Sequence, residues 1–297
     1  MPHVQHFYDR ATSTFTYVVS DPDSGLSVVI DPVLDLDYAS GRLGTDSADQ
    51  VIEFVRDQNL SLRYILETHI HADHLSSAAY IREQLGGNIV IGSQITAVQQ
   101  TFAAIFAEQD GFRQDGSQFD LMLLDADTLE LGSLQISALH VPGHTPACMA
   151  YHIGDALFVG DTLFMPDAGT ARCDFPGGDA RTLFESCQRL LALPDETRVF
   201  VCHDYQPGGR DIAFEATVAE QRAHNIHVGT GISANNFVEM REARDAALEM
   251  PTLILPSLQV NMRAGNLPPT DASGKLFLKV PINAFGGAAL DRFASEE

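Results

Sequence analysis

The stretch E-T-H-I-H-A-D-H-L at residues 67 to 75 carries four polar side chains within six positions: His69, His71, Asp73 and His74. Histidine is the commonest metal ligand among the side chains, and aspartate adds an anionic oxygen. Such groups are costly to bury together without a cation, because none of them would have a partner. Solvated loop histidines are the alternative interpretation. The close spacing favours a metal site.

The residues on either side of this cluster predict where it lies. Residues 62 to 66 form an apolar run short enough for a buried strand, and residues 76 to 85 predict a helix that ends at Gly86 and Gly87. The cluster therefore lies on a loop between a strand and a helix. Active sites of layered α/β proteins tend to lie on such loops.

Length and charge limit the classes of protein that this chain can belong to. With 297 residues, of which 45% are hydrophobic, the chain can form one large domain or a core domain with an extension. Its net charge of −22, from 18 basic and 40 acidic residues, argues against nucleic acid or an anionic membrane surface as a partner. No apolar run reaches the roughly 18 to 20 residues of a membrane helix.

Cysteine usage and the first residues predict the compartment. None of the four cysteines (Cys148, Cys173, Cys187 and Cys202) forms a C-x-x-C pair, and no disulfide framework is indicated. Residues 1 to 7 have neither the basic nor the apolar segment of a signal peptide. We therefore expect a protein of the reducing cytoplasm.

The rest of the chain alternates between short β-rich runs and helical patterns. An antiparallel hairpin is expected from residues 14–19 and 26–30, which flank a turn. Residues 108 to 120 are polar and predict a surface loop. Further strands are expected at 88–91, 134–141, 149–153, 156–159 and 199–202, and helices at 46–58, 94–107 and 179–193.

Three later strands also end in a histidine or an aspartate. His144 follows the strand at 134–141, Asp161 follows 156–159, and His203 follows 199–202. Each of these residues alone could be a helix cap, a turn residue or a core histidine, but strand ends that converge on one rim are a common way to build a metal site. Asp31 ends the strand at 26–30. The sequence leaves open whether it supports the metal site or stabilises a turn.

Four motifs taken together resemble the metallo-β-lactamase superfamily. They are H-x-H-x-D-H at 69–74, G-H-T at 143–145, G-D-T-L-F at 160–164 and C-H-D-Y at 202–205, and the resemblance spans about residues 14 to 225. It implies an α+β fold, a four-layer αββα sandwich. We expect residues 1–225 to form the catalytic domain and residues 226–297 a C-terminal extension packed on the same domain.

Members of this superfamily can bind two metal ions. By resemblance, His69, His71 and His144 match one metal site and Asp161 matches the bridging position. The residues that match the other site are Asp73, His74 and His203.

Within the superfamily, the persulfide dioxygenase branch fits better than glyoxalase II. The loop G-T-A-R-C-D-F at 169–175, the run T-V-A-E-Q-R at 217–222 and the tail V-N-M-R-A-G at 260–265 all resemble that branch. The resemblance implies that glutathione persulfide is oxidised by O2 to sulfite and glutathione at a single ferrous iron, Fe(II), in each chain. A redox-active metal suits this reaction, since zinc has no redox chemistry.

The resemblance also implies a role for each candidate site residue. The iron ligands are His69, His144 and Asp161, and the residues that orient these ligands and water are His71, Asp73, His74 and His203. Candidates for binding glutathione are Arg172, Tyr205 and Arg263. The planar guanidinium of Arg172 suits a substrate carboxylate. A salt bridge to Asp174 is the alternative for that side chain.

Two other functions remain open at this stage. One is a zinc hydrolase of glutathione thioesters with two zinc ions, in which the metals generate hydroxide. The other is a binding protein without catalysis, which the complete set of ligand positions disfavours. The sequence also leaves the oligomeric state open. Residues 226–297 could pack between the subunits of a homodimer.

Overall fold

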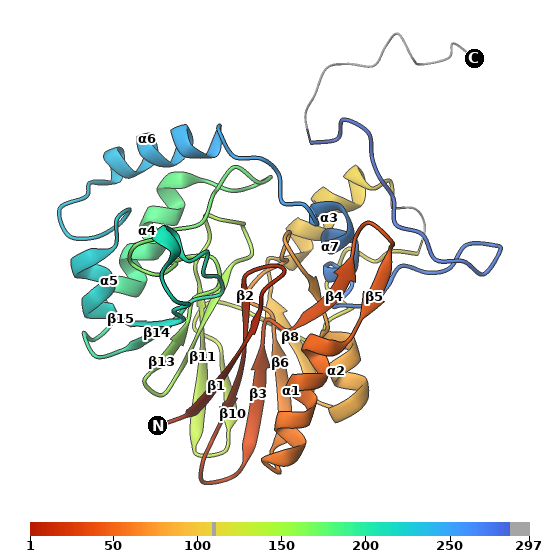
Figure 1. The fold of residues 1–297 in the computed structure, drawn as a ribbon, viewed down its shortest axis with the longest axis horizontal. Helices are drawn as coiled ribbons and strands as arrows, with labels where there is room; N and C mark the ends of the chain where they lie inside the picture. Colours follow the sequence, from red (N-terminus) through yellow and green to blue (C-terminus); the bar gives the residue numbers. More distant parts are fainter. Residues whose placement is uncertain (109–110, 286–297) are drawn as a thin grey trace.

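The computed structural model describes residues 1 to 108 and 111 to 285. Two six-stranded sheets lie face to face in the middle of the molecule, with helices on the outer side of each, so the predicted αββα sandwich is confirmed (Figure 1). The first sheet has the order β1-β2-β3-β6-β8-β9, and its strands are His3–Asp9, Thr14–Ser20, Leu26–Ile30, Ser61–Leu66, Asn88–Gly92 and Leu121–Leu123.

The second sheet is formed later in the chain. Its order is β10-β11-β12-β13-β14-β15, and its strands are Thr128–Leu131, Leu134–His140, Met149–Ile153, Ala156–Phe158, Arg198–Phe200 and Glu215–Thr217. The first sheet is covered by α1 (Asp46–Asp57), α2 (Ala78–Leu85) and α3 (Ile95–Ile105), and the second by α4 (Ala180–Leu191), α5 (Val218–His224) and α6 (Ala234–Asp245) (Figure 1).

Alternation along the strands explains why two sheets can share one core. In β2, Phe15, Tyr17 and Val19 belong to the core cluster between the sheets, whereas Val18 belongs to the cluster beneath the helices. Successive side chains of a strand point to opposite faces, so a strand buried on both faces needs apolar residues at nearly every position. These internal strands therefore appear in the sequence as short continuous apolar runs.

The parallel strands set the position of the loops that matter for function. β3, β6, β8 and β9 run parallel to one another, and β13 runs parallel to β14. Their carboxyl ends meet at one rim, where an isolated bridge between Thr14 and His203 joins the two sheets. A hydrogen bond from the Tyr151 hydroxyl to the carbonyl of Glu67, at 2.9 Å, also crosses between the sheets there.

Some elements were not predicted from the sequence. β4 (Val33–Asp37), β5 (Arg42–Gly44) and β7 (Leu75–Ser76) form a small third sheet beside the rim. The helix expected from residue 76 begins at Ala78 instead, because Leu75 and Ser76 pair with β4. These strands are held by partners distant in sequence, which local patterns do not reveal.

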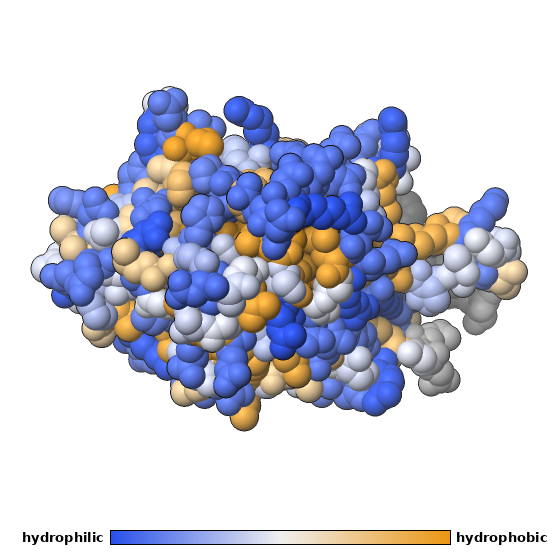
Figure 2. Space-filling view, turned by 90° about the horizontal axis from the view of Figure 1, so that it is seen from below, coloured by the Kyte–Doolittle hydropathy of each residue, from blue (hydrophilic) through white to orange (hydrophobic). Residues whose placement is uncertain are grey.

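The surface agrees with the acidic composition. Figure 2 shows a face that is hydrophilic over most of its area, with hydrophobic residues gathered near its middle. Among the described residues, no helix is both long and apolar enough to cross a membrane.

The C-terminal part of the chain returns to the rim through α7 (Ile254–Asn261). The side chain of the buried Asn261 accepts a hydrogen bond from the N–H of Ser76 at 2.7 Å and donates to the carbonyls of His71 and His74, both at 2.8 Å. One amide therefore satisfies three buried backbone groups of the histidine loop. The boundary expected at residue 225 stays a prediction, although α7 is closely joined to the rest of the fold.

Replacing Asn261 by alanine should lower the free energy of unfolding by about 3 kcal/mol, because buried backbone groups lose their partners. Urea denaturation of the purified protein measures this change. Asn266→Ala is the matched control, since Asn266 is exposed and donates to one carbonyl only. Equal destabilisation by the two substitutions would contradict this role of Asn261.

Candidate metal centre

The histidine loop begins at a buried aspartate on the neighbouring strand. Asp31 follows β3 with a positive φ of 50°, and its carboxylate accepts hydrogen bonds from the backbone N–H and the hydroxyl of Thr68 at 2.7 and 2.9 Å. Aspartate tolerates this left-handed conformation better than most residues. Thr68 precedes His69, so Asp31 holds the start of the loop. Of the two roles left open for Asp31, the structure favours support of the site.

Three of the predicted ligands form one compact group. The Nε2 atoms of His69 and His144 lie 4.0 and 3.6 Å from Asp161 Oδ2, and all three side chains are buried. His144 Nδ1 contacts the carbonyl of Arg172 at 2.6 Å. That contact leaves Nε2 free to face the group, which is how metal-binding histidines are usually oriented.

A glycine allows Asp161 to approach the histidine loop. Gly160 has a φ of +51°, and a Cβ atom at this position would lie 2.6 Å from the Thr68 hydroxyl oxygen. Any other residue would therefore push the strand end away from Thr68. This explains the glycine of the G-D-T motif.

The remaining candidates form a second group on the other side of Asp161. His203 Nε2 lies 3.3 Å from both Asp73 Oδ2 and Asp161 Oδ1. His74 Nδ1 contacts the carbonyl of Leu75 at 3.1 Å, so the other ring nitrogen faces the site. Asp161 thus lies between the two groups, with Oδ2 near His69 and His144 and Oδ1 near His203.

The donor atoms themselves indicate a cation. Several buried side-chain atoms in the two groups have no hydrogen-bond partner: Nε2 of His74 and His203, Oδ2 of Asp73 and Oδ1 of Asp161. Buried polar atoms are rarely left in this state. Nitrogen and carboxylate oxygen donors suit zinc and ferrous iron alike, so the residues fit a metal of either kind.

Burial also sets the protonation state of two histidines. Burial, together with the neighbouring His71, lowers the pKa of His69 well below its usual value and that of His74 to about 4. Both rings are therefore neutral at pH 7. The neutral imidazole is the form that binds metal ions.

His71 is in a different electrostatic environment. Its Nε2 lies 3.0 Å from Asp31 Oδ1 and 3.6 Å from Glu67 Oε2. Burial lowers its pKa, but the carboxylates of Asp31 and Glu67 outweigh this effect and raise the pKa to about 9. A protonated ring cannot act as a ligand. In this structure, His71 therefore lies beside the Asp31 carboxylate as a protonated ring.

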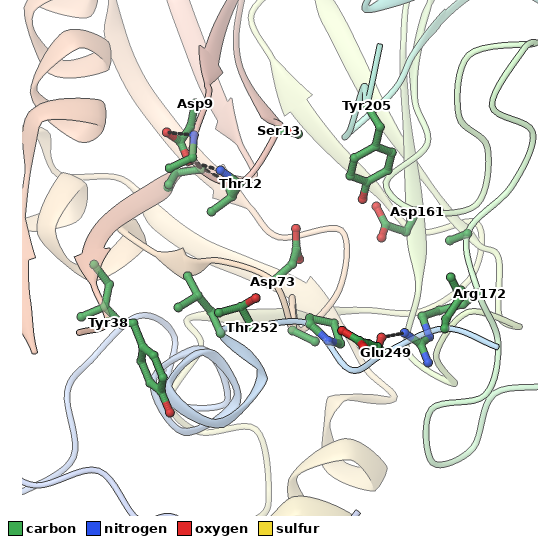
Figure 3. A pocket seen from close by; sticks show the side chains of 18 of the residues that line it. Asp9, Thr12, Ser13, Tyr38, Asp73, Asp161, Arg172, Tyr205, Glu249 and Thr252 are labelled. Carbon is green, nitrogen blue, oxygen red and sulfur yellow. Dashed lines mark hydrogen bonds between the residues drawn. The ribbon is translucent and has the colours of Figure 1, made fainter. Parts of the chain in front are cut away.

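A cavity of about 1010 Å³ opens in front of the metal-binding residues, and Asp73, His144 and Asp161 form part of its wall. Figure 3 shows Asp73 and Asp161 facing this space, with Tyr205 above Asp161. The wall combines five parts of the chain that are distant in sequence: residues 9–13, 33–44, 164–175, 205 and 241–253. The site is therefore accessible to a substrate of considerable size.

The predicted substrate-binding residues occupy different places. Tyr205 and Arg172 line the cavity, and the ring of Tyr205 stacks on that of His203 with centroids 5.9 Å apart. Arg263 is not among the residues that line the cavity. Its guanidinium lies 2.8 Å from Glu108 and stacks over the ring of Phe112.

The cavity also contains residues that the sequence did not single out. Residues 33–44 and 241–253 had no predicted role. Glu67, which lies outside the cavity beside His71, had none either. The one signal for Glu67 in the sequence is its position two residues before the H-x-H-x-D-H motif. Nothing local indicated that β4 or the chain after α6 would reach the metal ligands.

Comparison with known proteins finds one matching family model and several similar chains. A family model described as "Metallo-beta-lactamase superfamily" matches residues 9 to 203. A Burkholderia pseudomallei protein named a "probable metallo-hydrolase" is 52% identical, with 95% of this chain and 99% of the relative aligned. The protein "Glyoxylase B2" of Dictyostelium discoideum is 44% identical, with 94% of this chain and 97% of the relative aligned.

Proteins named for a different chemistry are also similar. Human "Persulfide dioxygenase ETHE1, mitochondrial" is 28% identical, with 90% of each chain aligned. The crystal structure of ETHE1 from Myxococcus xanthus superposes with a TM-score of 0.71 at 28% identity, covering 89% of this chain and all of that one.

Replacing His144 by alanine should remove bound metal, because the group loses one of its three nearest donors. We expect metal affinity to fall by more than about 100-fold. Metal content after dialysis against a weak chelator measures this loss. His224→Ala is the control, since His224 is exposed on α5. Retention of metal by His144→Ala at the level of the control would show that His144 is not a ligand.

Proposed function

Because the chain belongs to the metallo-beta-lactamase superfamily, we propose that it is a persulfide dioxygenase. In this proposal, His69, His144 and Asp161 hold one ferrous iron, and the enzyme oxidises a thiol persulfide with O2 to sulfite and the thiol. Glutathione persulfide is the substrate that the family resemblance implies. The proposal rests chiefly on the compact group of two histidines and one carboxylate beside an open cavity.

The chemistry of this donor set supports iron. Two histidines and one carboxylate leave positions open for other ligands, and this set is typical of non-haem Fe(II) oxygenases. When bound, ferrous iron would supply the redox chemistry by which O2 can oxidise a closed-shell sulfur atom. The chain's own residues then have to bind the persulfide, orient it and keep the ligands in place.

The position of His71 also favours a single metal. In a two-metal site His71 would be a ligand, but here its Nε2 lies 3.0 Å from Asp31 and its pKa is raised to about 9. Glu67 is buried beside this ring and hydrogen-bonded to Ser76, and burial raises its pKa to about 8, so it is mostly uncharged at pH 7. The Asp31 carboxylate therefore stabilises the protonated form of His71. We assign to His71, Asp73, His74 and His203 the role of orienting ligands and water.

The overall reaction sets what the cavity must accommodate. One persulfide, one O2 and one water give one thiol and one sulfite. The terminal sulfur is oxidised, O2 is reduced, and water supplies the remaining oxygen as the S–S bond breaks and the thiol leaves with a proton. The cavity of about 1010 Å³ has room for the carrier thiol while its sulfur reaches the ligand group.

Similarity to the human and Myxococcus proteins supports the same function. Both align over about nine tenths of this chain at 28% identity. More similar proteins carry the names hydrolase and glyoxylase, which describe a different chemistry.

A zinc hydrolase of thioesters is the second candidate, and one observation favours it. Asp73, His74 and His203 each present a buried donor atom without a hydrogen-bond partner. A second metal ion would satisfy these atoms. Two zinc ions could then activate water for attack on a thioester.

Oxygen uptake distinguishes the two candidates. With iron-loaded protein and glutathione persulfide, we expect one O2 consumed and one sulfite formed for each persulfide. An oxygen electrode and a sulfite assay measure these amounts. Two zinc ions in each chain together with turnover of S-lactoylglutathione, and no O2 uptake, would overturn the dioxygenase proposal.

The metal number can also be tested by matched carboxylate variants. Asp161→Asn should abolish iron binding, whereas Asp73→Asn should retain one iron and lose about 10-fold to 100-fold in O2 uptake, as residues that orient ligands typically do. Iron content and uptake rate are the measurements. Under the two-metal alternative, Asp73→Asn would instead lose one of two bound ions.

A further inference from the structure

The loop of residues 169–175 reaches the metal centre through a backbone group. The carbonyl of Arg172 accepts a hydrogen bond from Nδ1 of His144 at 2.6 Å, and the loop forms part of the cavity wall. A histidine whose Nδ1 donates in this way keeps Nε2 unprotonated and available to a metal ion. The position of one carbonyl oxygen in this loop therefore controls how His144 is presented.

A buried ion pair on α6 holds the loop on both sides of Arg172. Asp245 accepts a hydrogen bond from the backbone N–H of Cys173, directly after Arg172, at 2.9 Å. Arg241 donates to the carbonyl of Thr170, two residues before Arg172, at 3.1 Å. A hydrogen bond of 2.8 Å from Arg241 Nε to Asp245 Oδ1 joins the two side chains. Backbone groups on both sides of the Arg172 carbonyl are therefore fixed to one helix.

The helix that carries this pair has its own anchors. Its first turn is capped by the side chain of Ser233. Phe237 is fully buried and packs against Phe184 of α4, with ring centroids 5.5 Å apart (Figure 1). Arg241 and Asp245 follow Phe237 at intervals of four residues, so all three lie along one face of α6. The pair is thus attached to a fixed support and not to a free end of the chain.

The deep burial of the pair indicates a role other than general stability. Arg241 and Asp245 are 2% and 4% exposed. Removing two charges from water is costly, and apolar residues of similar volume often give equal or greater stability than a buried ion pair. Apolar residues lack the polar atoms that bind the backbone of the loop. The contacts to Thr170 and Cys173 therefore distinguish this pair from an apolar replacement.

We propose that Arg241 and Asp245 are positioning residues of the metal centre. Through the loop they fix the Arg172 carbonyl, and through that carbonyl they fix the ring of His144. In this role they act on the metal only through His144. The inference goes beyond the proposed function, because it holds for iron or zinc and for either of the two candidate reactions.

A double substitution separates this role from stability. Arg241→Met combined with Asp245→Leu keeps much of the side-chain volume and removes the hydrogen bonds to the loop, so the free energy of unfolding should change little. Zinc affinity should nevertheless fall by about 10-fold to 100-fold, as after loss of a residue that orients a ligand. Competition with a fluorescent zinc chelator measures the affinity, and urea denaturation of the full chain measures the stability.

The matched control removes another ion pair. Arg198 and Glu215 are joined by hydrogen bonds of 2.7 and 3.1 Å, and neither is among the residues that line the cavity. Arg198→Met combined with Glu215→Leu should therefore leave zinc affinity unchanged.

The ring proton of His144 gives a second readout, which a purely structural role of the pair would not change. Proton NMR of the metal-free protein should show a slowly exchanging Nδ1 proton, assigned to His144 by its absence in His144→Ala. We expect this signal to shift or disappear in the Arg241/Asp245 double variant and to persist in the control.

The proposal is overturned if the folded Arg241/Asp245 variant binds zinc as tightly as the unchanged protein and keeps the His144 signal, or if the control loses affinity equally. Should the double variant fail to fold, Asp245→Asn decides. It keeps the shape of the side chain and weakens the hydrogen bonds that the charge strengthens. A lower zinc affinity then supports the proposal, and an equal affinity overturns it. None of these measurements uses persulfide or O2, so failure of the proposed function leaves the test intact.

Discussion

The rim of this molecule depends on the cost of burying polar atoms without partners. Histidine and aspartate side chains from four strand ends converge where water is largely excluded, and several of their donor atoms have no hydrogen-bond partner. Burial of these atoms costs too much without compensation, and a cation supplies it. The fold therefore acts as a scaffold that brings candidate metal ligands from four strand ends together. The choice of metal then depends on which donors are free.

Supporting residues decide how many donors are free. Asp31 holds Thr68 and lies close to His71, so a single carboxylate positions the histidine loop and influences the charge on one of its rings. Glu67 adds a second carboxyl group beside the same ring. Asn261 fixes the loop from the opposite side through three backbone hydrogen bonds. The candidate ligands His69, His144 and Asp161 lie together next to the cavity, whereas His71 lies beside Asp31.

The cavity gives a substrate access to the candidate metal centre. Its wall includes the candidate ligand Asp161 and the apolar residues of β4, and most of its arginines are paired with acids. The resemblance to persulfide dioxygenases supports the proposed reaction, whereas most of the wall comes from segments outside the recognised motifs.

Local patterns were sufficient to predict most of this fold. Apolar runs of four to seven residues, such as 62–66 and 149–153, correspond to strands buried on both faces, and the helices at 46–58 and 179–193 were expected within about two residues of their observed ends. β1, β15, the small third sheet and the helices α5, α6 and α7 were not predicted. β1 is only partly buried, and β4 and β7 are formed by pairing between distant segments.

The sequence by itself determined which side chains could bind a metal and that they follow strand ends. Residue type and hydrophobic periodicity are local properties that can be recognised from neighbouring residues. Only the tertiary structure decided that Asp31 and Glu67 lie beside His71, that Arg263 pairs with Glu108 away from the cavity, and that β4 and the segment after α6 form part of its wall. These are contacts between segments far apart in the chain. They arise from packing of the two sheets and their helices, which no local pattern encodes.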